Sequence, residues 1–538
     1  MRPMGITRAD SSVRGLGDGG QPDFSASDSE ERTDGDVTDG VGSGVGVADV
    51  EPAEVSSQCF ARLSPTAIVY MSAFVSSLTS VLLGYDVGVI SGAIKYIQAD
   101  FGLSDLQKGV IVSSLNLVAA GGGLIAGTVS DALGRKRSIA AACLVFITGS
   151  VIKIIAQNFG VLLLGRIVTG LGVGCGFVVA PVYIAEITPA NIRGRLTSLT
   201  DISINVGIVI GYLVAFLVAE TVDGDSGKWR TMLGISIVPP FVILSSLCLL
   251  PESPRWLLGR GREQEAFVVL CRIVPTADVA KKELAEIQSV VGEEHDLKST
   301  WSDLLFSTSP AIRSTVLLGL GLGIAQQASG SEAVVYYSPS VLDDAGLTSD
   351  SAQLAGNILV GLFKLGGEVL AFFLVDRTGR RPLFNVSSSF VTLFLFILAV
   401  SFSVSAPPWV TLSGLCLFMW FFSLGMGALT FVVASEIFPL RLRGRGVSLT
   451  VAVNRLTSGL VALSFPLLER GFTAGGTFFL FSIASVCTVW FYQSKVPETN
   501  GKTLEEISVE ASHEVALQDI AASLGLAPVA PPGTVDAL

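Results

Sequence analysis

The sequence predicts an all-α membrane protein of twelve transmembrane helices, arranged as two pseudo-symmetric halves of six helices each. Three observations support this prediction. Half of the 538 residues are hydrophobic and only 15% are charged, whereas soluble proteins average about 25% charged residues. Apolar runs long enough to cross a bilayer recur along the chain. Three short motifs of the first half return in the second half.

The apolar runs form two sets of six. Each run is close to the roughly 20 residues that an α-helix needs to cross the hydrocarbon core of a bilayer. The first set lies at about 67–90, 108–130, 138–157, 161–187, 197–219 and 231–250. The second set lies at about 312–338, 353–375, 383–404, 409–435, 446–468 and 475–494.

The internal repeat supports two homologous halves. The pairs are Asp131-x-x-Gly-Arg-Lys with Asp376-x-x-Gly-Arg-Arg (376 − 131 = 245), Glu186-x-x-Pro-x-x-x-Arg-Gly-Arg with the same motif from Glu436 (436 − 186 = 250), and Pro251-Glu-Ser with Pro497-Glu-Thr (497 − 251 = 246). The motifs keep their order and nearly one offset. Such repeats are typical of transporters whose halves are related by an axis along the membrane normal, with a site between them at the midplane.

Polar segments flank and join the two sets. The first sixty residues are rich in Gly, Asp, Ser and Glu, and such a composition buries too little apolar surface to offset chain entropy. The formal net charge of −11 reflects the acidic tails. We expect a disordered acidic cytoplasmic tail at 1–62, an N-terminal six-helix half at 63–250, a cytoplasmic linker with short helices at 251–311, a C-terminal six-helix half at 312–494 and a cytoplasmic C-terminal tail at 495–538.

Lys and Arg residues indicate the orientation, because cytoplasmic loops carry an excess of positive charge. They gather on one side of the predicted membrane: Arg135, Lys136, Arg137, Arg193, Arg195, Arg255, Arg260, Arg262, Arg377, Arg380, Arg381, Arg441, Arg443 and Arg445. We therefore expect this side, the linker and both termini in the cytoplasm. The plasma membrane is the expected location, with a vacuolar or other organelle membrane as the alternative.

The sequence offers little for catalysis. Its two histidines, His295 and His513, lie in polar surroundings, and its seven cysteines are scattered without CxxC spacing. No metal site, catalytic triad or cofactor is therefore expected. No basic patch indicates a nucleic-acid partner. We expect a monomer in the lipid bilayer that is not an enzyme.

A polar stretch at 326–339 follows directly from an apolar run. Polar side chains are costly against lipid, so these should face protein or a water-filled cavity. Gln326, Gln327 and Glu332 offer hydrogen-bond donors and acceptors suited to a molecule covered with hydroxyl groups. We predict that this stretch forms half of a substrate site at the membrane midplane.

Asp86 is a carboxylate inside the otherwise apolar first span. Such a residue costs about 2.5–3.5 kcal/mol on insertion scales, so it should be paired, protonated or functional. Arg166, at the start of the Gly-rich fourth span, is the nearest plausible partner in the same half. The alternative to a functional role is a static ion pair.

Several motifs together indicate a family: Gly127-x-x-x-Asp131-x-x-Gly-Arg-Lys, Pro181-x-Tyr-x-x-Glu186, Pro251-Glu-Ser-Pro-Arg-Trp256, Gln326-Gln327-x-Ser-Gly, Asp376-x-x-Gly-Arg-Arg and Pro497-Glu-Thr-x-Gly501. With them, the chain resembles the sugar porters of the major facilitator superfamily over about residues 65–510. Within this family the chain most resembles the polyol/monosaccharide–proton symporters. Two stretches carry this likeness: Leu83-Gly-Tyr-Asp-Val-Gly-Val-Ile-Ser-Gly-Ala93 and Val453-Asn-Arg-Leu-Thr-Ser-Gly459. The resemblance implies the major facilitator fold.

The resemblance also implies roles for single residues. Asp86 corresponds to the protonation site of proton-coupled members and Arg166 to its partner. Asp201 and Glu332 place carboxylates where many sugar porters have Gln and Asn, as polyol-type members do. An ionised carboxylate only accepts hydrogen bonds, which suits a ligand rich in hydroxyl donors. The alternatives are a helix-start role for Asp201 and an ion pair with Lys364 for Glu332.

Five further residues correspond to substrate-binding or gate positions: Gln326, Gln327, Tyr336, Tyr337 and Asn454. Plain helix packing is the alternative for the two tyrosines. Phe431 stands where many members carry a Trp that stacks on the sugar ring. A phenyl ring keeps this stacking but lacks the indole N–H donor. Lys364 and Glu368 are spaced to pair along one helix face.

Charges at the cytoplasmic helix ends correspond to those that latch the two halves in the outward-facing state: Asp131, Arg135, Lys136, Glu186, Arg193, Arg195, Asp376, Arg380, Arg381, Glu436, Arg443 and Arg445. The expected function is proton-coupled transport of a polyol or monosaccharide by alternating access, with the substrate and the proton as partners. The rival hypotheses are an uncoupled facilitator and a non-transporting sugar sensor.

Overall fold

The computed structural model describes residues 64–296, 300–307, 309–439 and 442–499, and within these ranges every regular element is a helix. The predicted N-terminal tail lies outside the described residues, as does the C-terminal tail from residue 500 onward.

The first six predicted spans correspond to the helices α2 (Pro65–Phe101), α3 (Asp105–Leu133), α4 (Arg135–Ile154), α5 (Phe159–Ile187), α6 (Ala190–Thr221) and, as one interrupted span, α7 (Asp225–Gly234), η2 (Ile235–Ile237) and α8 (Val238–Leu247). Local sequence sets several helix starts. The side chains of Ser64 and Asn158 accept hydrogen bonds from first-turn amides, and Ser104 forms a capping box with Gln107. These side chains satisfy N–H groups that have no partner within the helix.

The linker forms four short helices: α9 (Pro254–Gly259), α10 (Glu263–Ile273), α11 (Ala277–Asp296) and α12 (Trp301–Leu305). The apolar face of α10 belongs to the same buried cluster as Val69 of α2 and Ile139 of α4. The linker helices therefore cover one end of the N-terminal helices. We call this end, with the starts of α2 and α4, the linker side, and the other end the opposite side.

The second half comprises α13 (Pro310–Ala328), α14 (Ser331–Asp344), α15 (Asp350–Thr378), α16 (Arg380–Ser403), α17 (Pro408–Phe422), the π-helical segment η3 (Ser423–Gly427), α18 (Ala428–Ile437) and α19 (Arg443–Lys495). The span predicted at 312–338 is present as two helices rather than one. It is broken between α13 and α14, where Gly330 adopts a left-handed conformation with φ of 77°. Glycine takes this conformation without the steric cost that a side chain would add.

By length and composition, ten helices among the described residues could cross a membrane. One of them, α19, contains two predicted spans, because Thr473 interrupts it with φ 64° and ψ 168°. The broken pair α13 and α14 supplies a further span that falls outside this count. The twelve predicted spans are thus all present as helical segments, and the all-α prediction is confirmed.

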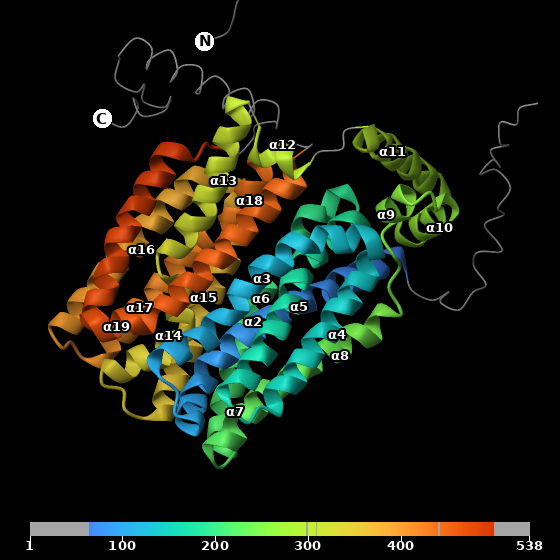
Figure 1. Ribbon diagram of the computed structural model, residues 1–538. Helices are drawn as coiled ribbons and strands as arrows, with labels where there is room; N and C mark the ends of the chain where they lie inside the picture. Colours follow the sequence, from blue (N-terminus) through green and yellow to red (C-terminus); the bar gives the residue numbers. More distant parts are fainter. Residues whose placement is uncertain (1–63, 297–299, 308, 440–441, 500–538) are drawn as a thin grey trace, which may run out of the picture. The chain divides into compact units, whose positions relative to one another are not determined.

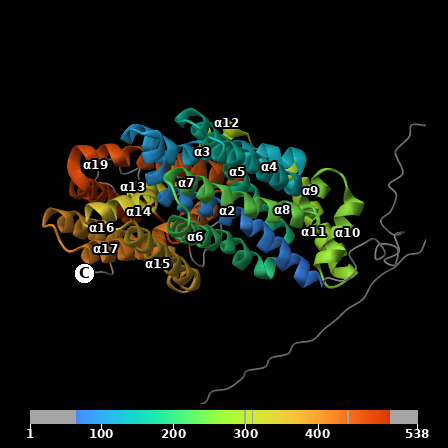
Figure 2. The same cartoon turned by 90° about the horizontal axis from the view of Figure 1, so that it is seen from below.

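Figure 1 shows α2–α8 grouped together and α13–α19 grouped together, and the view in Figure 2 agrees. Within the first group, α2 packs along α6, and α5 packs against α3 and α4. Within the second, α19 packs against both α13 and α16. The groups meet where α3 lies against α19 and α6 lies against α15. We call this boundary between the two pseudo-symmetric halves the seam. It is the place where a site shared by both halves would lie.

Candidate functional site

A cavity lies at this seam and is lined by side chains of both halves. The first half contributes Leu83, Val87, Asp201, Ile204, Asn205 and Ile208, and the second half contributes Gln326, Gln327, Ser331, Glu332, Val335, Lys364, Glu368, Phe422, Gly427, Phe431 and Arg455. The structure therefore brings five of the eight predicted substrate residues to one cavity: Asp201, Gln326, Gln327, Glu332 and Phe431. Their roles in binding stay predictions.

The break at Gly330 positions the polar stretch. Gln326 and Gln327 lie in the last turn of α13, while Ser331 and Glu332 lie in the first turn of α14. Both helix ends therefore reach the cavity, as in transporters whose discontinuous helices supply backbone ends to a midplane site. A carboxylate in the first turn of α14 is also favourable, because the start of a helix carries partial positive charge.

Amide side chains form a hydrogen-bond network at the cavity wall. Gln326 Nε2 donates to the carbonyl oxygens of Met426 (2.8 Å) and Gly427 (3.0 Å) in η3. Asn454 Nδ2 donates to Gln326 Oε1 (2.6 Å), and Gln327 Nε2 donates to Asn454 Oδ1 (3.2 Å). Asn454 is fully buried behind the two glutamines. It orients them rather than lining the cavity.

Three cavity residues keep hydrogen-bonding atoms unpaired within the described part of the chain. Gln327 Oε1, Glu332 Oε2 and Arg455 Nε are buried and have no hydrogen-bond partner there. Glu332 Oε1 lies 3.9 Å from Arg455 Nη1, and the Arg455 guanidinium lies 5.3 Å from the ring centre of Phe177. Because buried polar atoms are normally satisfied, these atoms are suited to a polar ligand.

The structure contradicts one alternative interpretation of a cavity residue, and for another it gives the expected ion pair with a different partner. Asp201 is not a helix-start residue, because α6 begins at Ala190 and Asp201 lies in its interior. The ion pair of Glu332 is made with Arg455, whereas Lys364 Nζ donates to Asn205 Oδ1 across the seam. Lys364 and Glu368 both line the cavity, but the hydrogen bond that the structure gives Lys364 runs to α6 and not along its own helix.

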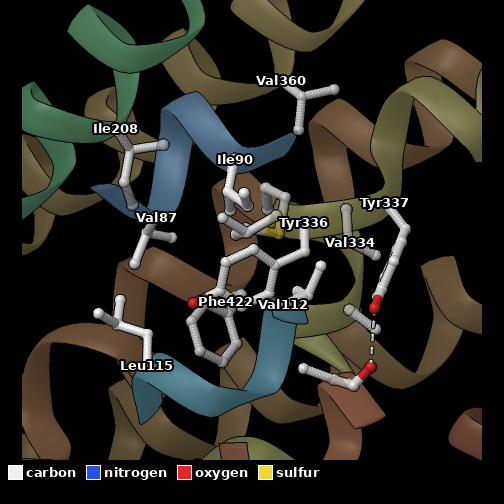
Figure 3. Close-up of a cluster of buried hydrophobic side chains, with 14 of the residues drawn as sticks. Val87, Ile90, Val112, Leu115, Ile208, Val334, Tyr336, Tyr337, Val360 and Phe422 are labelled. Carbon is white, nitrogen blue, oxygen red and sulfur yellow. Dashed lines mark hydrogen bonds between the residues drawn. The ribbon is translucent and has the colours of Figure 1, made fainter. Parts of the chain in front are cut away.

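The aromatic residues divide between the cavity and the packed seam. Phe431 lines the cavity and makes an edge-to-face contact with Phe177, with ring centres 6.1 Å apart. Figure 3 shows Tyr336 among apolar side chains that include Ile90, Leu115 and Phe422. Its hydroxyl accepts a hydrogen bond from Asn116 Nδ2 at 3.0 Å.

Tyr337 is likewise buried in packing. Its hydroxyl donates to the carbonyl oxygen of Ala462 at 3.0 Å, the contact drawn in Figure 3. Its ring stacks on Phe465 at 5.1 Å. Neither Tyr336 nor Tyr337 is among the side chains that line the cavity. The structure therefore gives both tyrosines the packing position that was the alternative to a pocket role.

Asp86 is not among the side chains that line the cavity, although Leu83 and Val87 of the same helix are. Its Oδ2 accepts a hydrogen bond from Arg166 Nη1, the expected partner. Its Oδ1 accepts a second one from Lys153 Nζ of α4 at 2.6 Å. The side chains of all three residues have no exposed surface. Arg166 also donates to the carbonyl oxygens of Ile111 and Val112.

The charges predicted at the gate form matching pairs, one in each half. Arg135 donates two hydrogen bonds of 2.8 Å to the carboxylate of Glu186, and it also pairs with Asp131 at 3.0 Å. Arg380 pairs with Glu436 at 3.1 Å. Bidentate pairs between arginine and carboxylate are among the stronger charge-assisted contacts. The motif that recurs in the sequence therefore forms the same arginine–glutamate pair in both halves.

Two acidic residues complete these clusters. Glu252 accepts hydrogen bonds from the backbone N–H groups of Arg135 and Lys136, and Glu498 accepts them from those of Arg380 and Arg381. Each carboxylate therefore caps the start of α4 or α16, where negative charge is favourable. Both belong to motifs that recur in the sequence, so the repeat was a signal that could have identified them.

The remaining gate charges lie around these pairs. Lys136 Nζ donates to Leu250 O and Arg381 to Gln493 O, while Arg193 Nε reaches Thr188 O at 3.4 Å and Arg443 Nε reaches Phe438 O at 3.5 Å. Arg195 is exposed, and Arg445 has a partner. The side chain of Asp376 lies outside the described residues. That these charges latch the halves stays a prediction.

Sequence reasoning missed Lys153, Arg455, Asn205 and Asn116 as members of the site or its surroundings. Lys153 and Arg455 are single cations inside apolar spans. Intramembrane charges are rare and mark functional pathways, so the same argument that singled out Asp86 could have found them. No comparable sequence signal distinguishes Asn205 or Asn116.

Known proteins resemble the chain over most of its length. The family model described as Sugar (and other) transporter matches residues 72–511. The chain is 42% identical over 469 residues to Probable polyol transporter 4 of Arabidopsis thaliana, covering 86% of this chain and 89% of that protein. It is 33% identical to Glucose transporter GlcP of Staphylococcus epidermidis, covering 82% and 97% respectively.

Solved structures agree with these sequence relatives. The proton:xylose symporter XylE bound to 6-bromo-6-deoxy-D-glucose matches with a TM-score of 0.71 at 30% identity, covering 82% of this chain and 98% of that one. The partially occluded inward open form of the xylose transporter XylE from E. coli matches with a TM-score of 0.72 at 27% identity, covering 81% and 100%. The chain therefore belongs to the sugar (and other) transporter family, the sugar porters of the major facilitator superfamily, and is a multi-pass integral membrane protein.

Proposed function

We propose that this protein is a proton-coupled symporter of polyols or monosaccharides that works by alternating access and has no catalytic activity. Relatives at 42% and 38% identity are named as polyol transporters, and the structural neighbour XylE is a proton:xylose symporter. The protein is expected as a monomer in the plasma membrane, with the linker side and both termini in the cytoplasm, because that side carries the Lys and Arg clusters.

The observation that carries the substrate proposal is the set of unpaired polar atoms in the cavity. Gln327 and Glu332 present acceptors, and Arg455 presents a donor. A hydroxyl group both donates and accepts, so adjacent hydroxyls of one ligand can satisfy acceptors and a donor together. Asp201 adds a carboxylate on the facing half. Carboxylates favour ligands that turn many O–H groups toward them, which favours polyols over hexoses.

The proposed proton site is separate from the substrate cavity. Asp86 of α2 pairs with Lys153 of α4 and Arg166 of α5. The neighbouring Leu83 and Val87 face the cavity. The two sites thus share one helix, so a rotation or bend of α2 changes both at once. This is how loading of the proton and of the substrate becomes linked.

Alternating access is supported by where the halves touch. On the opposite side, Lys95 of α2 pairs with Asp350 of α15 at 2.6 Å, and Asn116 of α3 donates to Ser458 of α19 at 2.7 Å. Arg470 reaches Asp105 at 3.4 Å. These contacts hold the opposite side together. Breaking them and forming contacts on the linker side would present the cavity to the other compartment.

The test is uptake by purified full-length protein in proteoliposomes, with hexoses, pentoses, inositol and linear polyols, each with and without an imposed pH gradient. Accumulation of at least one polyol above the outside concentration, abolished by an uncoupler, is expected. Equilibration without accumulation would identify the rival facilitator. No uptake of any substrate in the panel would support the rival sugar sensor.

Asp86→Asn should abolish accumulation driven by the pH gradient while leaving substrate exchange measurable. The amide carries no negative charge to balance a proton bound in this cluster, while its one oxygen still accepts a hydrogen bond from a neighbouring cation. Counterflow and uphill uptake are measured on the same preparation, with Asp223→Asn as a matched exposed control. Uphill uptake equal to that of the wild type in Asp86→Asn would remove Asp86 from the coupling mechanism.

A further inference from the structure

Lys153 is a second cation at the buried carboxylate of Asp86. The site therefore contains two positively charged groups and one negatively charged group when all three are ionised. Arg166 and Lys153 both approach the one carboxylate, and none of the three side chains is exposed. With every group ionised, the cluster would carry a net charge of +1 on side chains that have no exposed surface. Buried charge is costly unless it is paired, so this excess cation requires a physical explanation.

Among the described residues, no second carboxylate is paired with Lys153 or Arg166. Within α4, the Lys153 ammonium lies over the ring of Phe146, with Nζ 5.3 Å from the ring centre. α3 offers carbonyl oxygens that accept from Arg166, and Ser236 of η2 is bonded to Ser150 of α4.

The next charged groups are engaged elsewhere. Arg230 of α7 donates to Ala156 O, just beyond the end of α4, and to Asp100 near the end of α2. Glu332, across Tyr336 in the other half, is paired with Arg455. The balance of charge is therefore decided within the three residues.

Only one of the two cations can lose its proton. A guanidinium stays charged in proteins, whereas a buried lysine amine can become neutral. With a neutral Lys153, the carboxylate and Arg166 balance to a net charge of zero. One added proton then gives a net charge of +1 if it binds the amine nitrogen. A proton on Asp86 would instead have to occupy an oxygen that already faces a hydrogen-bond donor, since both oxygens are engaged.

We propose that the transported proton is held by Lys153, across its hydrogen bond to Asp86, rather than by Asp86 itself. The step is Lys153–NH2 with Asp86–COO⁻ plus H⁺ giving Lys153–NH3⁺ with Asp86–COO⁻. The proton binds the nitrogen lone pair, no other bond is broken, and the cluster gains one unit of charge. Asp86 is the counter-ion that makes this gain tolerable. The proposal rests on the proposed proton coupling.

Transport by lysine variants gives the first test. Lys153→Met and Lys153→Gln are expected to lose accumulation driven by the pH gradient, from the wild-type ratio to about 1, while counterflow exchange stays within about tenfold of the wild type. Lys153→Arg, which keeps a fixed charge, is expected to lose accumulation as well. Lys281→Met, an exposed lysine of α11, is the matched control and should accumulate normally.

Two transport outcomes would overturn the proposal. Wild-type accumulation in Lys153→Met would show that the carboxyl suffices as proton carrier. Restored accumulation in Lys153→Arg would show that only the positive charge at this position matters. A merely structural lysine would reduce exchange and accumulation together, and its arginine variant would recover both.

An infrared titration of the purified full chain in lipid nanodiscs locates the proton without any lysine variant. Difference spectra of the wild type and of Asp86→Asn are compared across the pH range. The proposal expects no protonated-carboxyl band that is present in the wild type and missing in Asp86→Asn. Such a band would overturn it. If the wild type fails to accumulate substrate, the proposed coupling fails, and this titration still decides where the proton binds.

Discussion

Glu332 combines an ion pair with a buried oxygen that has no hydrogen-bond partner among the described residues. One of its oxygens lies 3.9 Å from a guanidinium nitrogen of Arg455, and the other is buried without a hydrogen-bond partner among the described residues. The Arg455 guanidinium orients this carboxylate at the wall of the cavity, since charge-assisted contacts between arginine and carboxylate are directional. At the scale of single residues, this carboxylate is the feature that favours a ligand rich in hydroxyl donors.

Glu332→Gln should weaken binding of a polyol by about tenfold and of a hexose by less. The amide has the same shape but replaces a charged acceptor with a neutral one, and hydrogen bonds to charged groups contribute about 1.5–3 kcal/mol against about 1 kcal/mol for neutral ones. Binding is measured by competition against a labelled substrate in proteoliposomes. Equal losses for both ligand classes would contradict the role given to the carboxylate.

At the scale of elements, two departures from regular α-helix lie at the cavity. The break at Gly330 exposes the ends of α13 and α14 to it. The π-helical segment η3 frees the carbonyl oxygens of Met426 and Gly427, which receive Gln326. Segments of this kind occur frequently at functional sites because they leave backbone groups available. Ser387 secures η3 by accepting the N–H of Met426.

Gly330→Ala should destabilise the protein by about 2 kcal/mol and impair transport. A side chain at φ 77° is strained, which costs about 1–2 kcal/mol, and a Cβ there would lie 2.9 Å from the ring of Phe481. Thermal unfolding and substrate exchange are measured together. Gly121→Ala is the control, because a Cβ there meets no atom within 4 Å. Identical behaviour of the two variants would argue against a need for the break.

At the scale of the whole molecule, the two halves are held together mainly at the opposite side. Asn116 is central, since its Nδ2 donates both to Tyr336 of α14 and to Ser458 of α19. Tyr212 of α6 adds a bond to Val335 O at 2.7 Å, and Asn357 of α15 donates to Ser91 of α2 at 3.0 Å. These bonds are made in one arrangement of the halves, so they bias the equilibrium between the states.

Asn116→Ala should shift the equilibrium toward the state open on the opposite side by roughly thirtyfold, because two hydrogen bonds of about 1 kcal/mol each are lost. Hydrogen–deuterium exchange should rise at the ends of α2 and α14 on that side. Thr221→Ala is the control, since its hydroxyl bonds only within α6, to Leu217 O. Unchanged exchange in α14 would mean that Asn116 does not stabilise the closure.

The sequence by itself determined the spans, the repeat and the family, because these depend on local hydropathy and on motifs that need no partner. It also indicated Asp86 and Arg166, since charges in apolar spans are costly wherever the helices pack. Only the tertiary structure decided the partners: Arg455 rather than Lys364 for Glu332, and Lys153 beside Arg166 for Asp86. Pairing depends on how helices far apart in the chain are rotated against each other. That rotation results from packing along whole helix faces, so the residue type at one position does not predict it.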